Sequence, residues 1–198
     1  MSTFDSPTDI HALPRRVPKA EFVAGRLSLA FCNTVALPDA ADRCADAESF
    51  AAWAARGGHA LPAPPDAASL ERFLALRETL IAIFAQLVIG FDPPAAALEA
   101  LAAAALPPQL VWDSAAHRAV ARPGAHDPLT AFRQAIVADA IDLLTGEAQF
   151  RIKRCPAADC RWFFFDTTKN GRRRWCAMGD CGVKDKVGRF RIRHQAAF

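Results

Sequence analysis

The stretch RCPAADCRWFFFDTTKNGRRRWCAMGDC, residues 154–181, decides the fold of the C-terminal part of this chain. It carries cysteines in the spacing C-x4-C-x15-C-x4-C, namely Cys155, Cys160, Cys176 and Cys181. Two equal pairs in a basic, turn-rich segment are hard to explain as unrelated core cysteines, and they are typical of a zinc site. Because four thiolates leave no position for a reacting water, we expect one structural Zn2+ per chain and no catalytic metal.

Positive charge is concentrated around these cysteines. Residues 151–198 hold 13 Lys and Arg against 4 Asp and Glu, whereas residues 1–150 hold 11 against 17. An acidic body with a basic end favours a nucleic-acid partner, with duplex DNA as the first choice, because cations neutralise phosphates. The candidate nucleic-acid-binding residues are Arg172, Arg173, Arg174, Lys184, Lys186, Arg189, Arg191 and Arg193. The simpler alternative is a solvated basic face on a small zinc module.

Several protein classes are disfavoured by the sequence. No apolar run is long enough for a transmembrane helix, and the N-terminal residues lack the apolar region of a secretory signal. We therefore expect a cytoplasmic protein with no membrane partner, in which clustered cysteines favour metal over disulfides. The glycine loops and the serine, histidine and paired-carboxylate motifs of common enzymes do not occur, so we expect no enzymatic activity.

Residues 21–146 predict a mainly helical domain, and the proline-containing residues 1–20 predict an extended arm. Apolar residues recur every three and four positions, and the stretches are bounded by capping residues, glycines or prolines. The expected helices begin near Leu27, at Asp46 or Ser49, at Asp66 or Ser69, at Asp92-Pro93 and at Asp127-Pro128, and the last four end near Gly57, Ile89, Ala105 and Gly146. Residues 109–112 and 117–122 predict one small β-hairpin within this domain.

Residues 147–198 predict a small α+β zinc module. Residues 150–153 alternate between apolar and basic side chains, as in a strand with one solvated face. Residues 161–166 and 172–175 flank an Asn170-Gly171 turn signal, so we expect these two segments to pair as a β-hairpin.

A C-terminal helix is the last expected element of the zinc module. Asp180 would cap this helix, which would run to about His194 and hold Cys181 in its first turn. The apolar residues Val183, Val187 and Phe190 would share one face of the helix, with the cations beside it.

Two further functions remain open. Trp162 to Phe165 would stack single-stranded bases if they formed an exposed platform, although we favour a role in the core or at a domain junction. The helical domain would make the chain a ligand sensor or protein-interaction adaptor if polar residues beside its apolar stripes formed an effector pocket. These residues are Arg26, Asn33, Thr34 and Arg77, and helix capping and surface polarity explain them more simply. We expect Cys32 and Cys44 to be ordinary buried or half-buried thiols.

The C-terminal stretch closely resembles the CGNR-type zinc finger of bacterial proteins. The matching features are Cys155-Pro156, Cys160, the aromatic run ending at Asp166, residues 170–176 (NGRRRWC) and Cys181-Gly182. The N-terminal part is similar to the ABATE domain, which is usually joined to this finger, through Phe22-Val23-x-Gly25-Arg26-Leu27 and Phe31-x-Asn33-Thr34. The resemblance implies zinc ligation by the four cysteines in a stress-linked transcription regulator, with DNA binding inferred for the finger.

The chain departs from the family pattern at two places. After the last cysteine the family reads Cys-Gly-Asn-Arg, whereas this chain has Val183-Lys184 in place of Asn-Arg. Lysine keeps the charge of arginine but lacks its planar bidentate fork. The second departure is Ala30, where the family usually has an acid before the aromatic residue and Asn-Thr. Any buried polar site built on that acid would be altered here.

Overall fold

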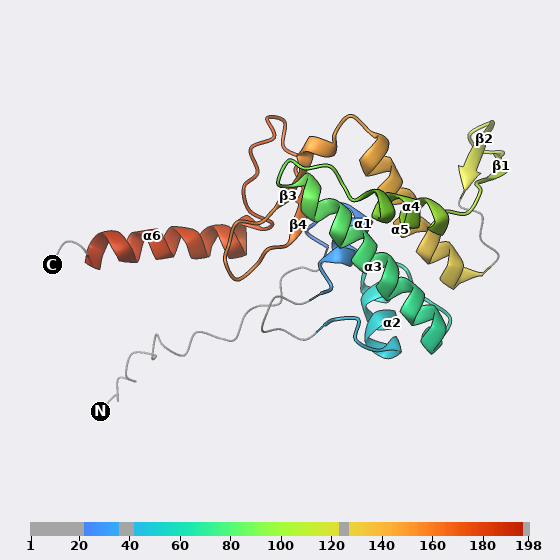
Figure 1. Ribbon diagram of the computed structural model, residues 1–198, viewed down its shortest axis with the longest axis horizontal. Coiled ribbons are helices and arrows are strands. Elements are labelled where there is room, and N and C mark those ends of the chain that lie inside the picture. The colour runs from blue at the N-terminus through green and yellow to red at the C-terminus, as the bar shows by residue number, and fades with distance from the viewer. Residues whose placement is uncertain (1–21, 36–41, 123–126, 196–198) are drawn as a thin grey trace, which may run out of the picture.

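The computed structural model describes residues 22–35, 42–122 and 127–195. Helices α1 to α5 form the body of the molecule, the β1–β2 hairpin lies at one end, and helix α6 extends from the other (Figure 1). The extended arm expected over residues 1–20 lies outside the described residues. Within the described ranges, no helix combines the length and apolar character needed to cross a membrane.

Most helices of the body begin where the capping residues predict. They are α1 (Leu27–Cys32), α2 (Ala47–Arg56), α3 (Ala67–Leu87), α4 (Ala95–Ala104) and α5 (Pro128–Thr145). Asp46, Asp66 and Asp127 each accept a hydrogen bond from the backbone N–H three residues later. The predicted start of α4 at Asp92-Pro93 is wrong. A proline disfavours helical backbone in the residue before it, so the helix begins only after Pro94.

Aromatic rings form the centre of the helical core. Phe31 of α1, Phe50 and Trp53 of α2, Phe73 of α3 and Phe132 of α5 are all buried. The centroids of neighbouring rings lie between 4.5 Å (Phe50 and Phe73) and 6.3 Å (Phe31 and Phe73) apart. Burying each such side chain contributes about 1.5–3 kcal/mol to the free energy of folding. Packing within this cluster is therefore the main interaction that holds these four helices together.

The two cysteines outside the zinc segment are buried in the same core. Cys32 lies at the end of α1 and Cys44 lies just before α2. Burial raises the pKa of the Cys32 thiol above its ordinary value, which keeps it protonated at neutral pH. The prediction of ordinary buried thiols at these positions is confirmed.

The predicted hairpin in the helical domain is confirmed. Strand β1 (Gln109–Asp113) pairs antiparallel with β2 (Arg118–Arg122), with Gln109 opposite Arg122 and Asp113 opposite Arg118. The hairpin stands away from the bundle in Figure 1, and Leu110 and Trp112 on its surface are exposed.

The zinc module contains a different sheet from the one that the Asn-Gly signal predicts. Strand β3 (Ile152–Arg154), which follows a short 3-10 turn at Gln149–Arg151, pairs antiparallel with β4 (Phe163–Phe165). The prediction that residues 172–175 return as the second strand is wrong. The backbone N–H of Arg173 donates to the side chain of Asp166 at 2.8 Å, so this segment is held by a buried carboxylate and forms no strand ladder.

The last helix begins later than the capping signal predicts. Asp180 lies inside a π-helical turn (Met178–Gly182), and α6 runs from Val183 to Gln195. The N–H of Gly182 donates to the carbonyl of Ala177 at 3.2 Å, a bond that makes this turn wider than an α turn. Cys181 therefore lies in the π-helical turn, and the prediction that Asp180 caps the helix is wrong.

The helical domain and the zinc module share one apolar core. Ile152 of β3 and Phe163 of β4 are buried in the same cluster as the rings of the helical body. The side chain of Asn33 donates to the carbonyl of Phe163 and accepts from its N–H, both at 2.8 Å. The N–H of Phe165 donates to the carbonyl of Ala24 at 2.8 Å. A division of the chain between residues 146 and 147 stays a prediction.

We predict that Asn33→Ala lowers the free energy of unfolding by about 2–4 kcal/mol, because it leaves a buried N–H and a buried carbonyl of Phe163 without partners. Chemical denaturation monitored by circular dichroism would measure this loss. Asn170→Ala is the matched control, since Asn170 is exposed and its replacement should change stability by less than about 0.5 kcal/mol. Equal unfolding midpoints for the two variants would contradict a bridging role for Asn33.

Candidate metal centre and the basic surface around it

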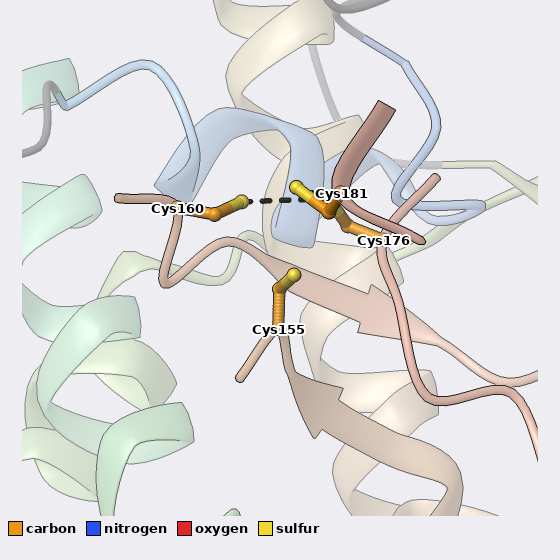
Figure 2. Close-up of side chains that lie close together, drawn as sticks. All are labelled: Cys155, Cys160, Cys176 and Cys181. Atoms are coloured by element: carbon orange, nitrogen blue, oxygen red, sulfur yellow. Dashed lines mark hydrogen bonds between the residues drawn. The ribbon is translucent and has the colours of Figure 1, made fainter. Parts of the chain in front are cut away.

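The four cysteines of the zinc segment come together in space. Cys155 follows β3 and Cys160 precedes β4. Cys176 lies in the segment before the π-helical turn, and Cys181 lies within that turn. Figure 2 shows the four side chains pointing toward one another. All four are buried, and their Sγ atoms lie within 4.8 Å of one another. The Sγ atoms of Cys160 and Cys176 are 3.4 Å apart, and those of Cys176 and Cys181 are 3.7 Å apart.

This sulfur cluster fits a tetrahedral zinc ion. A Zn–S bond of about 2.3 Å places neighbouring sulfurs about 3.8 Å apart, close to the separations found here. The surroundings are apolar, since Trp162 and Phe164 pack in the same buried cluster. The donor set and its burial support one structural zinc, held by Cys155, Cys160, Cys176 and Cys181. Four thiolates close the coordination sphere and leave no position for substrate.

The Cys176 thiol ionises with difficulty in the absence of a cation. Contacts with the thiols of Cys155 and Cys160, together with burial, raise the pKa of Cys176 far above its ordinary range. A bound dication reverses this preference because it stabilises the thiolates directly. Zinc binding at this site is therefore coupled to proton release, and it weakens as the pH falls.

The backbone hydrogen bonds around the cysteines set the first ligand turn. The N–H of Cys155 donates to the carbonyl of Trp162 at 2.8 Å, which extends the pairing of β3 and β4 up to the first ligand. The N–H of Cys160 donates to the carbonyl of Ala157 at 2.9 Å and closes a tight turn between the two cysteines. The short sheet thus carries the first cysteine pair at its end.

Arg173 fixes the second ligand turn to the rest of the chain. Its guanidinium donates to the carbonyl oxygens of Cys176, of Trp175 at 3.1 Å, of Phe165 at 3.2 Å and of Val23 at 2.8 Å. The same group lies over the ring of Phe164, 4.7 Å from its centroid. These contacts join a zinc ligand, strand β4 and the first described residues of the helical domain. Arg173 therefore acts as a structural brace. These contacts do not favour its predicted role in binding phosphate.

Asp166 anchors the loop that leads to the second cysteine pair. Its buried carboxylate accepts from Lys153 Nζ at 2.7 Å, from the N–H and the hydroxyl of Thr168, and from the N–H of Arg173. Burial alone would raise the pKa of Asp166, but the hydrogen bonds from Lys153, Thr168 and Arg173 outweigh it and lower the pKa. The carboxylate is therefore ionised at neutral pH and holds the loop in one conformation.

Lys184, which belongs to the first departure from the family pattern, connects the two ligand turns. Its Nζ lies 3.3 Å from Asp159, between the first two cysteines, and 3.2 Å from Asp180, next to Cys181. Burial would lower the pKa of Lys184, but the hydrogen bonds to Asp180 and Asp159 raise it. Lys184 thus pairs with acids inside the module, which does not favour its predicted role in binding nucleic acid. Val183, the other residue of this departure, is exposed at the start of α6.

The remaining predicted cations are exposed. Within the described residues, the guanidinium of Arg172, the ammonium of Lys186 and the guanidinium of Arg191 have no acidic partner. Arg174 lies over the ring of Trp175, 5.0 Å from its centroid, and is exposed. Arg189 pairs with Asp185 one turn earlier on α6, at 2.5 Å. The Nε of Arg193 donates to the carbonyl of Arg189 at 3.3 Å.

The prediction that the aromatic run belongs to the core is confirmed for three of its four residues, and the fourth, Phe165, is half-buried. Trp162, Phe163 and Phe164 are buried, so they offer no stacking platform. Aromatic residues that do lie at the surface near cations include Trp175, which is half-buried beneath Arg174, and Phe150, which lies beneath Arg151. The sequence does not identify Trp175 as a surface residue, because only the tertiary structure shows which aromatic residues of this segment face solvent.

The four residues predicted to form an effector pocket make separate contacts. Arg26 pairs with Asp139 and Asp142 of α5, at 2.7 Å and 2.5 Å. Asn33 is bonded to the backbone of Phe163. Arg77 donates to the hydroxyl of Thr34 at 3.0 Å, and its guanidinium also makes two hydrogen bonds to the carboxylate of Asp42. Among these four side chains, the structure shows one hydrogen bond, between Arg77 and Thr34, so these interactions do not favour a common pocket. Ala30, the second departure from the family pattern, is buried in α1.

We predict one zinc per chain in purified protein, measured by elemental analysis. Cys160→Ser should reduce the bound zinc well below one per chain, because hydroxyl is a poor replacement for thiolate. Since a structural zinc contributes about 10 kcal/mol or more of apparent folding free energy, chelation should unfold the zinc module and change the fluorescence of Trp162. Cys32→Ala is the control and should retain one zinc. Unchanged zinc content in Cys160→Ser would contradict the proposed ligand set.

We predict that Asp166→Asn lowers the free energy of unfolding by about 2 kcal/mol, because an amide cannot accept the hydrogen bonds of Lys153 and Thr168 as a carboxylate does. Denaturant titration of the zinc-loaded chain would measure the loss. Glu99→Gln, an exposed carboxylate on α4, is the matched control and should change stability little. A loss no larger than that of the control would show that the loop does not depend on Asp166.

Comparison with known proteins agrees with the two parts of the structure. Residues 151–194 match the family model described as "CGNR zinc finger". Residues 25–147 match the ABATE model, described as "Putative stress-induced transcription regulator". No curated protein matches the chain. Because the ABATE match covers more than half of the sequence and the four buried cysteines lie within the finger match, the chain belongs to the ABATE family and carries a CGNR zinc finger.

Proposed function

We propose that this chain is a non-enzymatic transcription regulator that binds duplex DNA through the basic surface of its zinc module. The observation that carries the proposal is the set of exposed cations that have no acidic partner among the described residues. Arg172 and Lys186 are examples, because the structural network around the zinc site does not use their charge. The family description as a transcription regulator agrees with this role.

Helix α6 supports the proposal by its charge and position. It carries five Lys and Arg and one acid, and it extends from the body as a single helix (Figure 1). An α-helix about 10–12 Å across fits the major groove of B-DNA, which is about 12 Å wide. Cations at Lys186, Arg191 and Arg193 would then meet phosphates along the groove, and the paired Lys184 would stay with the zinc module.

The loop before the second cysteine pair provides a second set of cations. Gly171 has a φ of +60°, a conformation that favours glycine, and it directs the chain back toward Asp166. Asp166 then fixes the backbone on both sides of the turn, at Thr168 and Arg173. Arg172 and Arg174 are therefore presented from a backbone that is already ordered. Such preorganisation lowers the entropic cost of binding phosphates.

Duplex DNA is favoured over single strands by the burial of the aromatic run. Proteins that bind single strands stack bases on exposed aromatic rings. Here Trp162, Phe163 and Phe164 are in the core, and Trp175 already stacks against Arg174. The exposed rings of Phe150 and Phe190 belong to separate elements, the 3-10 turn and α6. The cations of α6 and of the 169–174 loop remain, and they suit the phosphates of a duplex.

We predict that the zinc-loaded chain binds a labelled duplex with an affinity that falls steeply with salt. Fluorescence anisotropy at several salt concentrations would measure the slope of log K against log salt. Arg172→Gln should weaken binding and reduce the magnitude of this slope by about 0.9, the value expected for one lost phosphate contact. Arg118→Gln is the matched control, because it removes an exposed arginine from the hairpin at the other end of the molecule.

Several outcomes would contradict the proposal. Absent or salt-insensitive binding at low ionic strength would leave only a solvated basic face. Equal losses for Arg172→Gln and Arg118→Gln would place the contact surface elsewhere. Tighter binding to a single strand than to the duplex, with quenching of tryptophan fluorescence, would favour a single-strand binder.

A further inference from the structure

A groove lies between the end of helix α3 and the zinc module. One side is formed by Leu87, Val88 and Ile89, and the other by Phe150, Arg154 and the arginines at 172–174. The hollow has a volume of about 800 Å3. Ligand sites in proteins commonly fall between about 300 and 1,000 Å3, so the groove is large enough for a small organic molecule.

The apolar residues that line the groove are open to solvent. Ile89 is 61% exposed and Phe150 is 71% exposed, although residues of this size are usually covered in a folded chain. The position of Ile89 is set by the end of α3. Gly90 has a φ of +83°, its N–H donates to the carbonyl of Leu87, and the N–H of Phe91 donates to that of Gln86. These bonds end the helix and leave Ile89 facing the groove.

The wall of the groove is cationic. The residues that line it include five Lys and Arg and no Asp or Glu. Lys153 and Arg173 are used inside the module, but Arg154, Arg172 and Arg174 have no acidic partner within the described residues. An anion in the groove would compensate this positive charge.

We propose that this groove is a binding site for a small organic anion with an apolar body, such as an aromatic or branched carboxylate. The apolar part would cover Ile89 and Phe150, and the carboxylate would lie against Arg154 and Arg172. Guanidinium groups suit this role because their planar fork accepts a carboxylate with two hydrogen bonds.

Occupation of the groove opposes DNA binding, a consequence that rests on the function proposed above. Arg172 and Arg174 line the groove and also belong to the surface assigned to phosphates. A carboxylate paired with Arg172 removes that charge from the DNA surface. Coupling between two binding events is reciprocal. DNA should therefore lower the affinity for the anion by the same factor as the anion lowers the affinity for DNA. The site would give the regulator a small-molecule effector.

Direct binding tests the site without DNA. 1-Naphthoate would be titrated into the zinc-loaded full chain by calorimetry, with amide NMR shifts recorded in parallel. We expect shifts at Ile89, Gly90 and Phe150, and binding at least about tenfold tighter than that of the neutral 1-naphthamide. Ile89→Asp should weaken 1-naphthoate about tenfold or more, because it removes apolar contact and adds negative charge. Leu110→Asp, the same kind of change at an exposed hairpin residue, should leave binding unchanged.

Replacing one arginine tests the cationic residues of the groove separately from its apolar residues. Arg154→Gln should weaken the binding of 1-naphthoate and leave the binding of 1-naphthamide unchanged. Arg118→Gln should change the binding of neither probe. Equal affinity for the two probes, shifts confined to residues outside the groove, or no binding at all would overturn the proposal.

Competition with a labelled duplex tests the coupling. We expect 1-naphthoate to reduce duplex affinity in the wild-type chain but not in Ile89→Asp. Unchanged duplex affinity at saturating 1-naphthoate would overturn the coupling. If the chain does not bind a duplex, the proposed function fails, while the calorimetric and NMR results still decide whether the groove binds an anion.

Discussion

Four buried sulfur atoms within 4.8 Å of one another carry negative charge together only if a cation lies among them. The zinc module depends on this electrostatic requirement. Its sheet has only two strands of three residues each, and α6 makes its main described contacts with the π-helical turn that holds Cys181. Such small elements bury too little apolar surface to fold by packing alone, so the metal compensates for the missing core.

A second network connects this metal centre to the helical body. Arg173 bonds to carbonyls of a ligand residue, of β4 and of Val23, while Asn33 holds the backbone of Phe163. Phe163 itself belongs to the core of the helical domain. The metal centre and the helical core therefore support each other through a few buried polar contacts. A change at the cysteines should be felt at the start of α1, although the two regions are more than 100 residues apart in the sequence.

The cations of the zinc module divide into two groups by their contacts. Lys153, Arg173 and Lys184 are paired with acids or carbonyls and stabilise the loops that carry the cysteines. Arg172 and Arg174 face outward from the same loops, beside the groove next to α3. This division explains how a segment with 13 cations folds: some of the charge is neutralised internally, and the rest remains for an anionic partner.

Local sequence signals were sufficient for much of the fold. The aspartates before α2, α3 and α5 predicted three helix starts, because a cap acts on backbone groups only three residues away. Spacing alone identified the four cysteines, since few other sites require two pairs of buried thiols. The strand partner of β4 was not predictable from the Asn-Gly signal, because a buried carboxylate, Asp166, competes for the backbone of residues 172–175.

The sequence by itself determined the zinc ligands, the helices and the imbalance of charge, because each depends on residue type and short spacing. Only the tertiary structure decided that Arg173 is a brace while Arg172 has no acidic partner among the described residues, since Arg172 and Arg173 are identical and adjacent in the sequence. It also decided that Asn33 bonds to Phe163 and that Ile89 meets Phe150 across a groove. Contacts of this kind join distant parts of the chain, and they depend on how the whole chain packs.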